Sequence, residues 1–140
     1  MRPVTTGILA CATLTSCMST NAAVMDVNVK LAPICTDGVA LFTSPDRVGK
    51  DYQEVAILSS RASTEYTTEK GMYESQKRKA ASLGANGVIV NSMNQPQAGT
   101  QVVGVLLGTG TERHGSSLAV YIPSDSQRVR TACLGKSPQT

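Results

Sequence analysis

The chain has 140 residues and a formal net charge of +3, and hydrophobic residues make up 41% of it. That length suits one domain with one modest core, and the 16% of charged residues is typical of a globular chain rather than a disordered one. The small charge and the 4% of aromatic residues argue against nucleic-acid binding, and the apolar runs are too short for a polytopic membrane protein.

Residues 1–16 have the pattern of a bacterial export signal, because Arg2 supplies positive charge and residues 4–14 are weakly apolar without an acidic side chain. The tetrapeptide Leu14-Thr15-Ser16-Cys17 then resembles a lipobox, in which a peptidase cuts before the cysteine and lipid is attached to its thiol. Several acyl chains on Cys17 would anchor the protein stably, whereas one chain binds only marginally. The alternatives are an ordinary secretory signal in which Cys17 occurs by chance, or a buried N-terminal strand.

The predicted mature chain begins at Cys17 and is divided into two parts. Residues 17–33 are predicted to be the lipidated cysteine and a flexible tether, because this stretch is small and polar. Residues 34–140 are predicted to form a single α/β domain with an irregular C-terminal tail. By resemblance to enterobacterial sorting rules, Met18 in place of Asp favours the outer membrane, facing the periplasm. Secretion or an inner-membrane anchor are the alternatives.

The four cysteines have different expected fates. Cys11 would be removed with the signal and Cys17 would carry lipid. An exported protein meets an oxidising compartment, so a disulfide between Cys35 and Cys133 is predicted, with two free buried thiols as the alternative. Two cysteines and the lone His114 do not make a zinc ligand set, so neither a metal site nor a cofactor is predicted.

The first predicted strands lie between turn signals. Residues 39–42 are a short apolar run between Asp-Gly and Ser-Pro-Asp turns, which predicts a short edge strand. Residues 55–58 form a continuous apolar run, which predicts a strand buried on both faces. Residues 59–64 are polar and are predicted to form a loop.

One main helix is predicted over residues 67–83, packed on one face of the sheet. Thr67 or Thr68 can cap its start, and Gly84 is well placed for a left-handed C-cap. Residues 87–91 are the second strong strand, so the strand, helix and strand predict a βαβ unit.

Three further segments complete the predicted fold. Residues 101–107 are a strand candidate, favoured as core over pairing with a partner strand, and residues 108–116 are predicted to be a flexible loop. Residues 117–122 are predicted to be a strand, because Leu118, Val120 and Ile122 alternate with Ala119 and Tyr121. Residues 124–140 are polar and are predicted to be irregular. The expected fold class is therefore α+β with a βαβ core, in a small mixed sheet of about four strands.

Two motifs carry a resemblance to known bacterial proteins. A basic helix ends in Leu83-Gly84-Ala85-Asn86-Gly87 before an aliphatic strand, and Tyr52-Gln53-Glu54-Val55-Ala56-Ile57-Leu58-Ser59 lies ahead of the helix. Residues 52–122 thereby resemble YbjQ-type and RcsF-type domains and a set of uncharacterised bacterial lipoproteins. The resemblance implies a compact domain of sheet and helix exposed in the periplasm. RcsF-type domains carry two disulfides and this chain offers one pair, so no signalling or metal-binding role is carried over.

Candidate chemistry is sparse. Glu112, Arg113 and His114 in the predicted loop are the only weak ligand site, because Glu112 can orient His114 as a base but spacing sets no nucleophile. The run Lys77-Arg78-Lys79 is either a solvated helix face or a contact for anionic lipid headgroups. No catalytic residue is predicted.

The expected function is that of a lipid-anchored envelope protein. We expect a non-catalytic binding, assembly or stress-sensing module with the membrane and an envelope protein as partners. The alternative is a periplasmic lipoprotein that binds a small ligand or a metal.

Overall fold

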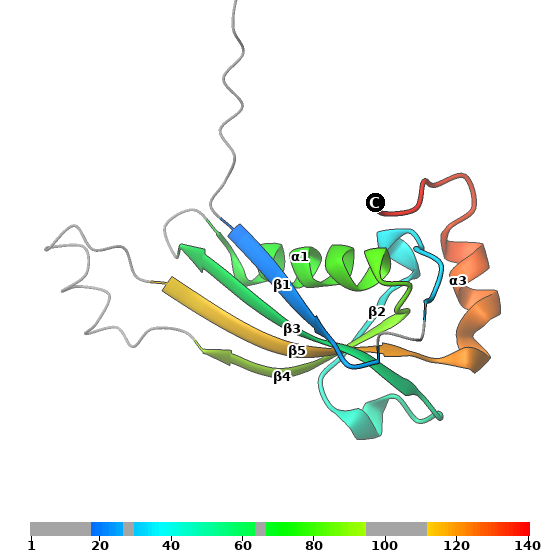
Figure 1. Cartoon of the computed structure of the whole chain (residues 1–140), viewed down its shortest axis with the longest axis horizontal. Coiled ribbons are helices and arrows are strands. Elements are labelled where there is room, and N and C mark those ends of the chain that lie inside the picture. Colours follow the sequence, from blue (N-terminus) through cyan, green and yellow to red (C-terminus); the bar gives the residue numbers. More distant parts are fainter. Residues whose placement is uncertain (1–17, 27–29, 64–66, 95–111) are drawn as a thin grey trace, which may run out of the picture.

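The structure is a computed structural model that describes residues 18–26, 30–63, 67–94 and 112–140 (Figure 1). These residues form an α+β fold with one mixed sheet of five strands, in the order β1-β3-β5-β4-β2, and two α-helices. The strands are β1 (Met18–Val24), β2 (Ala40–Phe42), β3 (Gln53–Ser63), β4 (Gly87–Asn94) and β5 (Glu112–Tyr121). The helices are α1 (Glu69–Ser82) and α3 (Ser126–Ala132), and the 3₁₀ turns are η1 (Thr36–Gly38), η2 (Pro45–Arg47) and η3 (Pro123–Asp125).

Helix α1 confirms the predicted main helix and its two boundary residues. The side chain of Thr68 accepts a hydrogen bond from the Gly71 N–H over 3.1 Å, which satisfies one free donor of the first turn. Gly84 ends the helix with φ +77°, and a Cβ there would lie 2.4 Å from the Cβ of Leu31. Glycine is therefore required at this position both by the left-handed backbone and by the close approach of the chain before η1.

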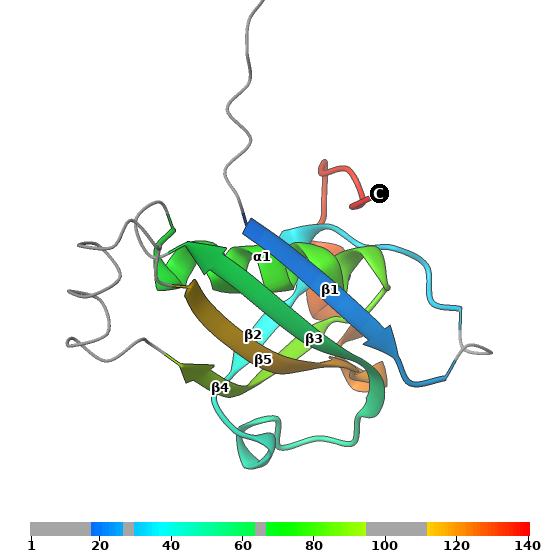
Figure 2. The same cartoon turned by 60° about the vertical axis from the view of Figure 1, so that its left-hand side comes forward.

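The strands on either side of α1 run parallel but are not neighbours. β5 lies between β3 and β4 and is antiparallel to both, whereas β2 pairs with β4 in parallel at one edge (Figure 2). The edge position predicted for residues 39–42 is confirmed. The predicted number of about four strands is only roughly right, because five are present in the described residues. The strand candidate at residues 101–107 lies outside them.

β1 corrects the prediction of a flexible tether over residues 17–33. All seven of its residues pair with β3, from Met18 opposite Ala62 to Val24 opposite Ala56. The segment has little strand propensity of its own, since it consists mainly of small and polar residues. The exposed edge of β3 and the packing of Ala22 on the core supply the stabilisation that the local sequence lacks.

β3 is longer and less buried than predicted. It continues through Ser63, where a loop over residues 59–64 was expected, and its side chains alternate between buried and exposed. Leu58, Ser60 and Ala62 are buried, whereas Ile57 is 43% exposed, so the strand is covered on one face rather than on both. The strand register shifts between Glu54 and Ala56, and Val55 and Ala56 are both buried. This bulge explains why two successive positions of the strand are apolar core positions.

The C-terminal third also departs from the predicted loops. Residues 112–116 were expected in a flexible loop, but they form the first half of β5, paired with β3. The tail, expected to be irregular, contains η3 and α3 before residues 133–140. The second helix carries no apolar stripe, which explains why its sequence gave no helical signal.

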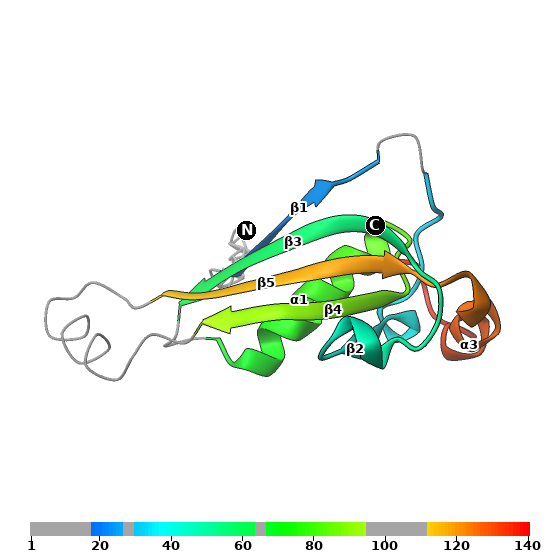
Figure 3. The same ribbon diagram turned by 90° about the horizontal axis from the view of Figure 1, so that it is seen from below.

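The core is divided between the two faces of the sheet. On the α1 side, Leu58, Val88 and Ala119 pack with the helix residues Ala80 and Ala81. Figure 3 shows α1 lying along this face of the sheet. On the opposite face a smaller cluster adjoins η2, and it contains Val48, Ile89, Val120 and Ile122 with Phe42, Tyr52 and Leu118 at its margin. No helix in the described residues is long and apolar enough to cross a membrane.

Candidate functional site

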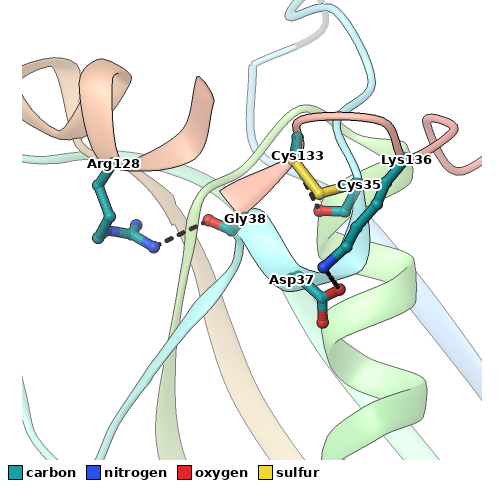
Figure 4. Close-up of a disulfide and its surroundings, with 6 residues drawn as sticks. All are labelled: Cys35, Asp37, Gly38, Arg128, Cys133 and Lys136. Carbon is teal, nitrogen blue, oxygen red and sulfur yellow. Dashed lines mark hydrogen bonds and ion pairs between the residues drawn. A yellow bond between two sulfur atoms is a disulfide. The ribbon is translucent and has the colours of Figure 1, made fainter. Parts of the chain in front are cut away.

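The disulfide predicted between Cys35 and Cys133 is present in the structure (Figure 4). The two sulfur atoms lie 1.98 Å apart, and the bond joins the residue before η1 to the residue after α3. Gly38 permits this close packing, because a Cβ there would lie 3.0 Å from the Cys133 sulfur. Lys136 hydrogen-bonds the carboxylate of Asp37, which lowers the pKa of Asp37 below its ordinary value. The cluster holds the C-terminal segment on the domain.

Arg128 connects α3 to three other parts of the fold. Its guanidinium donates to the carbonyl of Gly38 at 3.2 Å, to the carbonyl of Asn86 at 3.1 Å and to the carboxylate of Asp125 at 2.9 Å. Figure 4 shows the bond to Gly38 beside the disulfide. One side chain therefore joins η1, the start of β4 and η3. The planar guanidinium of arginine can donate several hydrogen bonds in fixed directions, which the ammonium group of lysine cannot do.

Asn86, in the Leu-Gly-Ala-Asn-Gly motif, does not have a left-handed backbone, because no non-glycine residue described has a positive φ. The buried Asn86 amide instead donates to the carbonyl of Ile122 at 2.9 Å and accepts from the N–H of Ile122 at 2.7 Å. Its side chain thus continues the sheet pairing beyond the end of β5. Asn86 therefore has a structural role, in which it joins the start of β4 to the residue that follows β5.

Asp125 is the buried acid of this region. Its side chain is 9% exposed and contacts both Lys50 and Arg128. The hydrogen bond from Lys50 lowers the pKa of Asp125 below its ordinary value, burial acts in the opposite direction, and Arg128 lowers the pKa further. A paired, ionised carboxylate of this kind is a stabilising element at neutral pH.

Replacing Asp125 with Asn should lower the free energy of unfolding by about 1–2 kcal/mol at pH 7, because two charge-assisted hydrogen bonds are weakened. The folded pKa is depressed, so the carboxylate contributes stability above the unfolded pKa of about 3.9 and loses it as the pH falls through the folded pKa. The free energies of unfolding of the two proteins, measured by urea titration, should therefore approach each other as the pH is lowered. A difference in the free energy of unfolding that does not change with pH would contradict this role of Asp125. The control is Asp46→Asn, which changes an exposed carboxylate.

The three residues of the predicted ligand loop lie in β5 and are divided between its two faces. Glu112 and His114 share the face opposite α1, with the His114 Nε2 and a Glu112 oxygen 3.6 Å apart. Arg113 lies on the other face and donates to the carbonyl of Thr67 at 3.2 Å. The structure therefore brings together Glu112 and His114 but not Arg113. No serine hydroxyl among the described residues hydrogen-bonds His114.

On the face of the sheet opposite α1, the part beyond the η2 cluster is exposed. This part, here called the open face, carries rows of polar residues that cross several strands. One row joins Asn21, Ser59, Ser116 and Ser92, and the next joins Ser19, Arg61 and His114. A shallow groove of about 290 Å³ follows these rows, lined by Ser59, Ser60, Arg61, Ser92, His114, Gly115 and Ser116. The next row contains Ile57 and Leu118, so an apolar strip borders the polar rows.

Sequence reasoning missed the open-face groove because its rows depend on strand register. Ser59 and Arg61 alternate along β3, and His114 and Ser116 alternate along β5. This alternation is the available signal, but both segments are also rich in polar and small residues, which is typical of loops. Within the described residues no group of three or more His, Cys, Asp or Glu side chains could hold a metal ion. Cys17 lies outside these residues.

The basic run of α1 is also divided. Lys77 lies 3.7 Å from Glu74 on the same helix, whereas Arg78 and Lys79 line a groove beside β1.

Comparisons with known proteins concern the fold. No protein-family model matches the sequence, and no curated protein matches it. Among solved structures, the crystal structure of the Francisella virulence factor FvfA is similar, with a TM-score of 0.51 and 11% sequence identity. The match covers 73% of this chain and 96% of that chain. At this identity the likeness shows a shared fold alone.

Proposed function

We propose that this protein is a lipid-anchored protein of the bacterial envelope that binds a protein partner through the open face of its sheet. Cys17 carries the lipid in this proposal, the preceding residues are the export signal, and the domain faces the periplasm from the outer membrane. It acts by binding, in an assembly or in stress sensing, rather than by catalysis.

The disulfide supports the envelope as the compartment. Disulfides persist in oxidising compartments and are rare in the bacterial cytosol. Cys35 and Cys133 are paired, and the lipobox-like tetrapeptide ends at Cys17, directly before β1. The resemblance to envelope lipoproteins agrees with this location.

The open face is the single observation that carries the binding role. α1 covers the other face, whereas Ser59, Arg61 and His114 are exposed in the middle of the sheet beside the apolar Ile57. A surface with an apolar strip and a polar margin is typical of protein interfaces. Sites for small molecules are clefts or cavities that enclose most of the ligand, whereas this groove lies open on the surface of the sheet, which favours a protein partner.

Photo-crosslinking in cells tests this proposal. A photoreactive residue in place of Ser59, on the open face, should give a discrete crosslinked species, whereas one in place of Gln127, exposed on α3, should not. Crosslinks of equal yield at both positions, or at neither, would contradict a binding role for the open face.

The anchor is tested in the same strains. Cys17→Ala should abolish lipid labelling and leave a soluble or uncleaved precursor, and the Ser59 crosslink should be lost because the domain no longer reaches its partner's membrane. Unchanged membrane fractionation and unchanged mass of the variant would refute the lipid anchor.

A further inference from the structure

A second groove lies between β1, α1 and the C-terminal residues. Its volume is about 350 Å³, and it is lined by Thr20, Ser75, Arg78, Lys79, Ser82, Gln139 and Thr140. We call it the basic groove, because Arg78 and Lys79 are its only charged side chains. Figure 1 shows the elements that form it: β1 runs beside α1, and the C-terminus lies near the end of the same helix.

The cations of the basic groove are available to a ligand. Neither Arg78 nor Lys79 forms an ion pair with any described residue, in contrast to Lys77, which lies near Glu74. No Asp or Glu side chain lines the groove, and its one negative group is the main-chain carboxylate of the C-terminal residue Thr140. An anion there would meet two positively charged side chains and would share them with that terminal carboxylate.

Hydroxyl groups complete the wall of the groove and hold β1 against α1. The Thr20 hydroxyl lies 2.8 Å from the Ser75 hydroxyl and 3.1 Å from that of Ser60, so a side-chain hydrogen bond joins the strand to the helix. A guanidinium, an ammonium and hydroxyl groups on one wall are donors that suit the oxygens of a phosphate group.

The basic groove is close along the chain to the proposed anchor. Thr20 is the third residue after Cys17, and three residues of fully extended chain span at most about 11 Å. β1 follows Cys17 directly, so no long linker separates this wall of the groove from the acylated residue. A lipidated Cys17 therefore holds the basic groove at the height of the phospholipid headgroups.

We infer that the basic groove binds the phosphate of an anionic phospholipid headgroup in the membrane that holds the anchor. This inference rests on the proposed lipid anchor at Cys17. The contact fixes the orientation of the domain, because the acyl chains hold one point and Arg78 and Lys79 hold a second.

Vesicle binding by the full chain carrying Cys17→Ser tests the groove without acylation. This protein should bind phosphatidylcholine vesicles that contain phosphatidylglycerol and should not bind pure phosphatidylcholine. Arg78→Gln with Lys79→Gln should weaken the binding about thirty-fold, since each basic residue near an anionic surface contributes roughly a five-fold change. The matched control is Arg47→Gln with Lys70→Gln, which removes the same charge from two exposed positions outside the groove.

Three outcomes would overturn the inference. Equal loss of binding in both double variants would show that net charge alone attracts the vesicles. Binding that survives Arg78→Gln with Lys79→Gln would place the contact elsewhere. Perturbation of the Ser75 and Arg78 amide resonances by inorganic phosphate, without vesicle binding, would assign a free anion as the ligand. Lipid labelling of Cys17 in cells is scored separately, so failure of the groove and failure of the anchor are distinguishable.

Discussion

Replacement of Asn86 with Ala should lower the free energy of unfolding by about 3–4 kcal/mol, because the N–H and the carbonyl of Ile122 both lose their partner in a buried site. The small side chain also leaves a void between β4 and the chain that follows β5. Urea unfolding followed by circular dichroism measures the change. Asn86→Asp should also be destabilising, since a carboxylate accepts from the Ile122 N–H but cannot donate to its carbonyl.

Asn21 provides the matched control for this substitution. It is an exposed asparagine on β1, and Asn21→Ala should change the stability by less than about 0.5 kcal/mol. If Asn86→Ala were as mild as Asn21→Ala, the two hydrogen bonds to Ile122 would not be the reason for asparagine in the motif.

Removal of the disulfide should have the largest effect on stability. Cys35 and Cys133 are 98 residues apart, and a chain-entropy treatment of a loop of this size gives about 4–5 kcal/mol. The double variant Cys35→Ala with Cys133→Ala should therefore unfold at a much lower urea concentration than the oxidised protein. Equilibrium unfolding with intrinsic tyrosine fluorescence or circular dichroism measures the difference.

Reductant separates the disulfide from the packing of the two side chains. Dithiothreitol should lower the stability of the wild-type protein towards that of the double variant and should leave the double variant unchanged. Cys11 and Cys17 are present in both proteins, so any effect of reductant through them appears in both. Wild-type protein whose stability is insensitive to full reduction would contradict a stabilising role of the bond.

The parts of the fold that could be predicted are those with a strong local signal. The Thr68 cap and Gly84 bracket α1, and both act through their own backbone neighbours, so sequence alone locates them. The apolar runs at the centres of β3 and β4 likewise mark buried strands. The pairing of Cys35 with Cys133 followed from counting cysteines and from the compartment, without any structural information.

The parts that could not be predicted depend on contacts between distant segments. β1 forms because β3 offers a free edge, and the first half of β5 forms because β3 and β4 extend beside it on either side. α3 is short and polar and is held by Arg128 and the disulfide rather than by an apolar stripe. None of these partners is near in sequence.

The candidate surfaces follow the same division. Glu112 and His114 were recognised as a chemically interesting pair, and the structure brings them within 3.6 Å, but in a strand rather than in a loop. The serines of the open-face groove come from β3, β4 and β5, so only the register of all three strands reveals them. Asn86 was assigned to the right motif, but its partner Ile122 lies 36 residues away.

The central position of β5 determines when the sheet can form during synthesis. β5 is the last strand in the chain, yet it separates β1 and β3 from β4 and β2. A nascent chain that lacks residues 112–140 can form only the pairs β1–β3 and β2–β4 among the described strands. The edges of β3 and β4 that face β5 are then unpaired. Such unpaired edges are prone to association with other chains. The sheet therefore closes only when the final segment arrives, and because its pairings are distant in sequence, folding is expected to be slow and all-or-none.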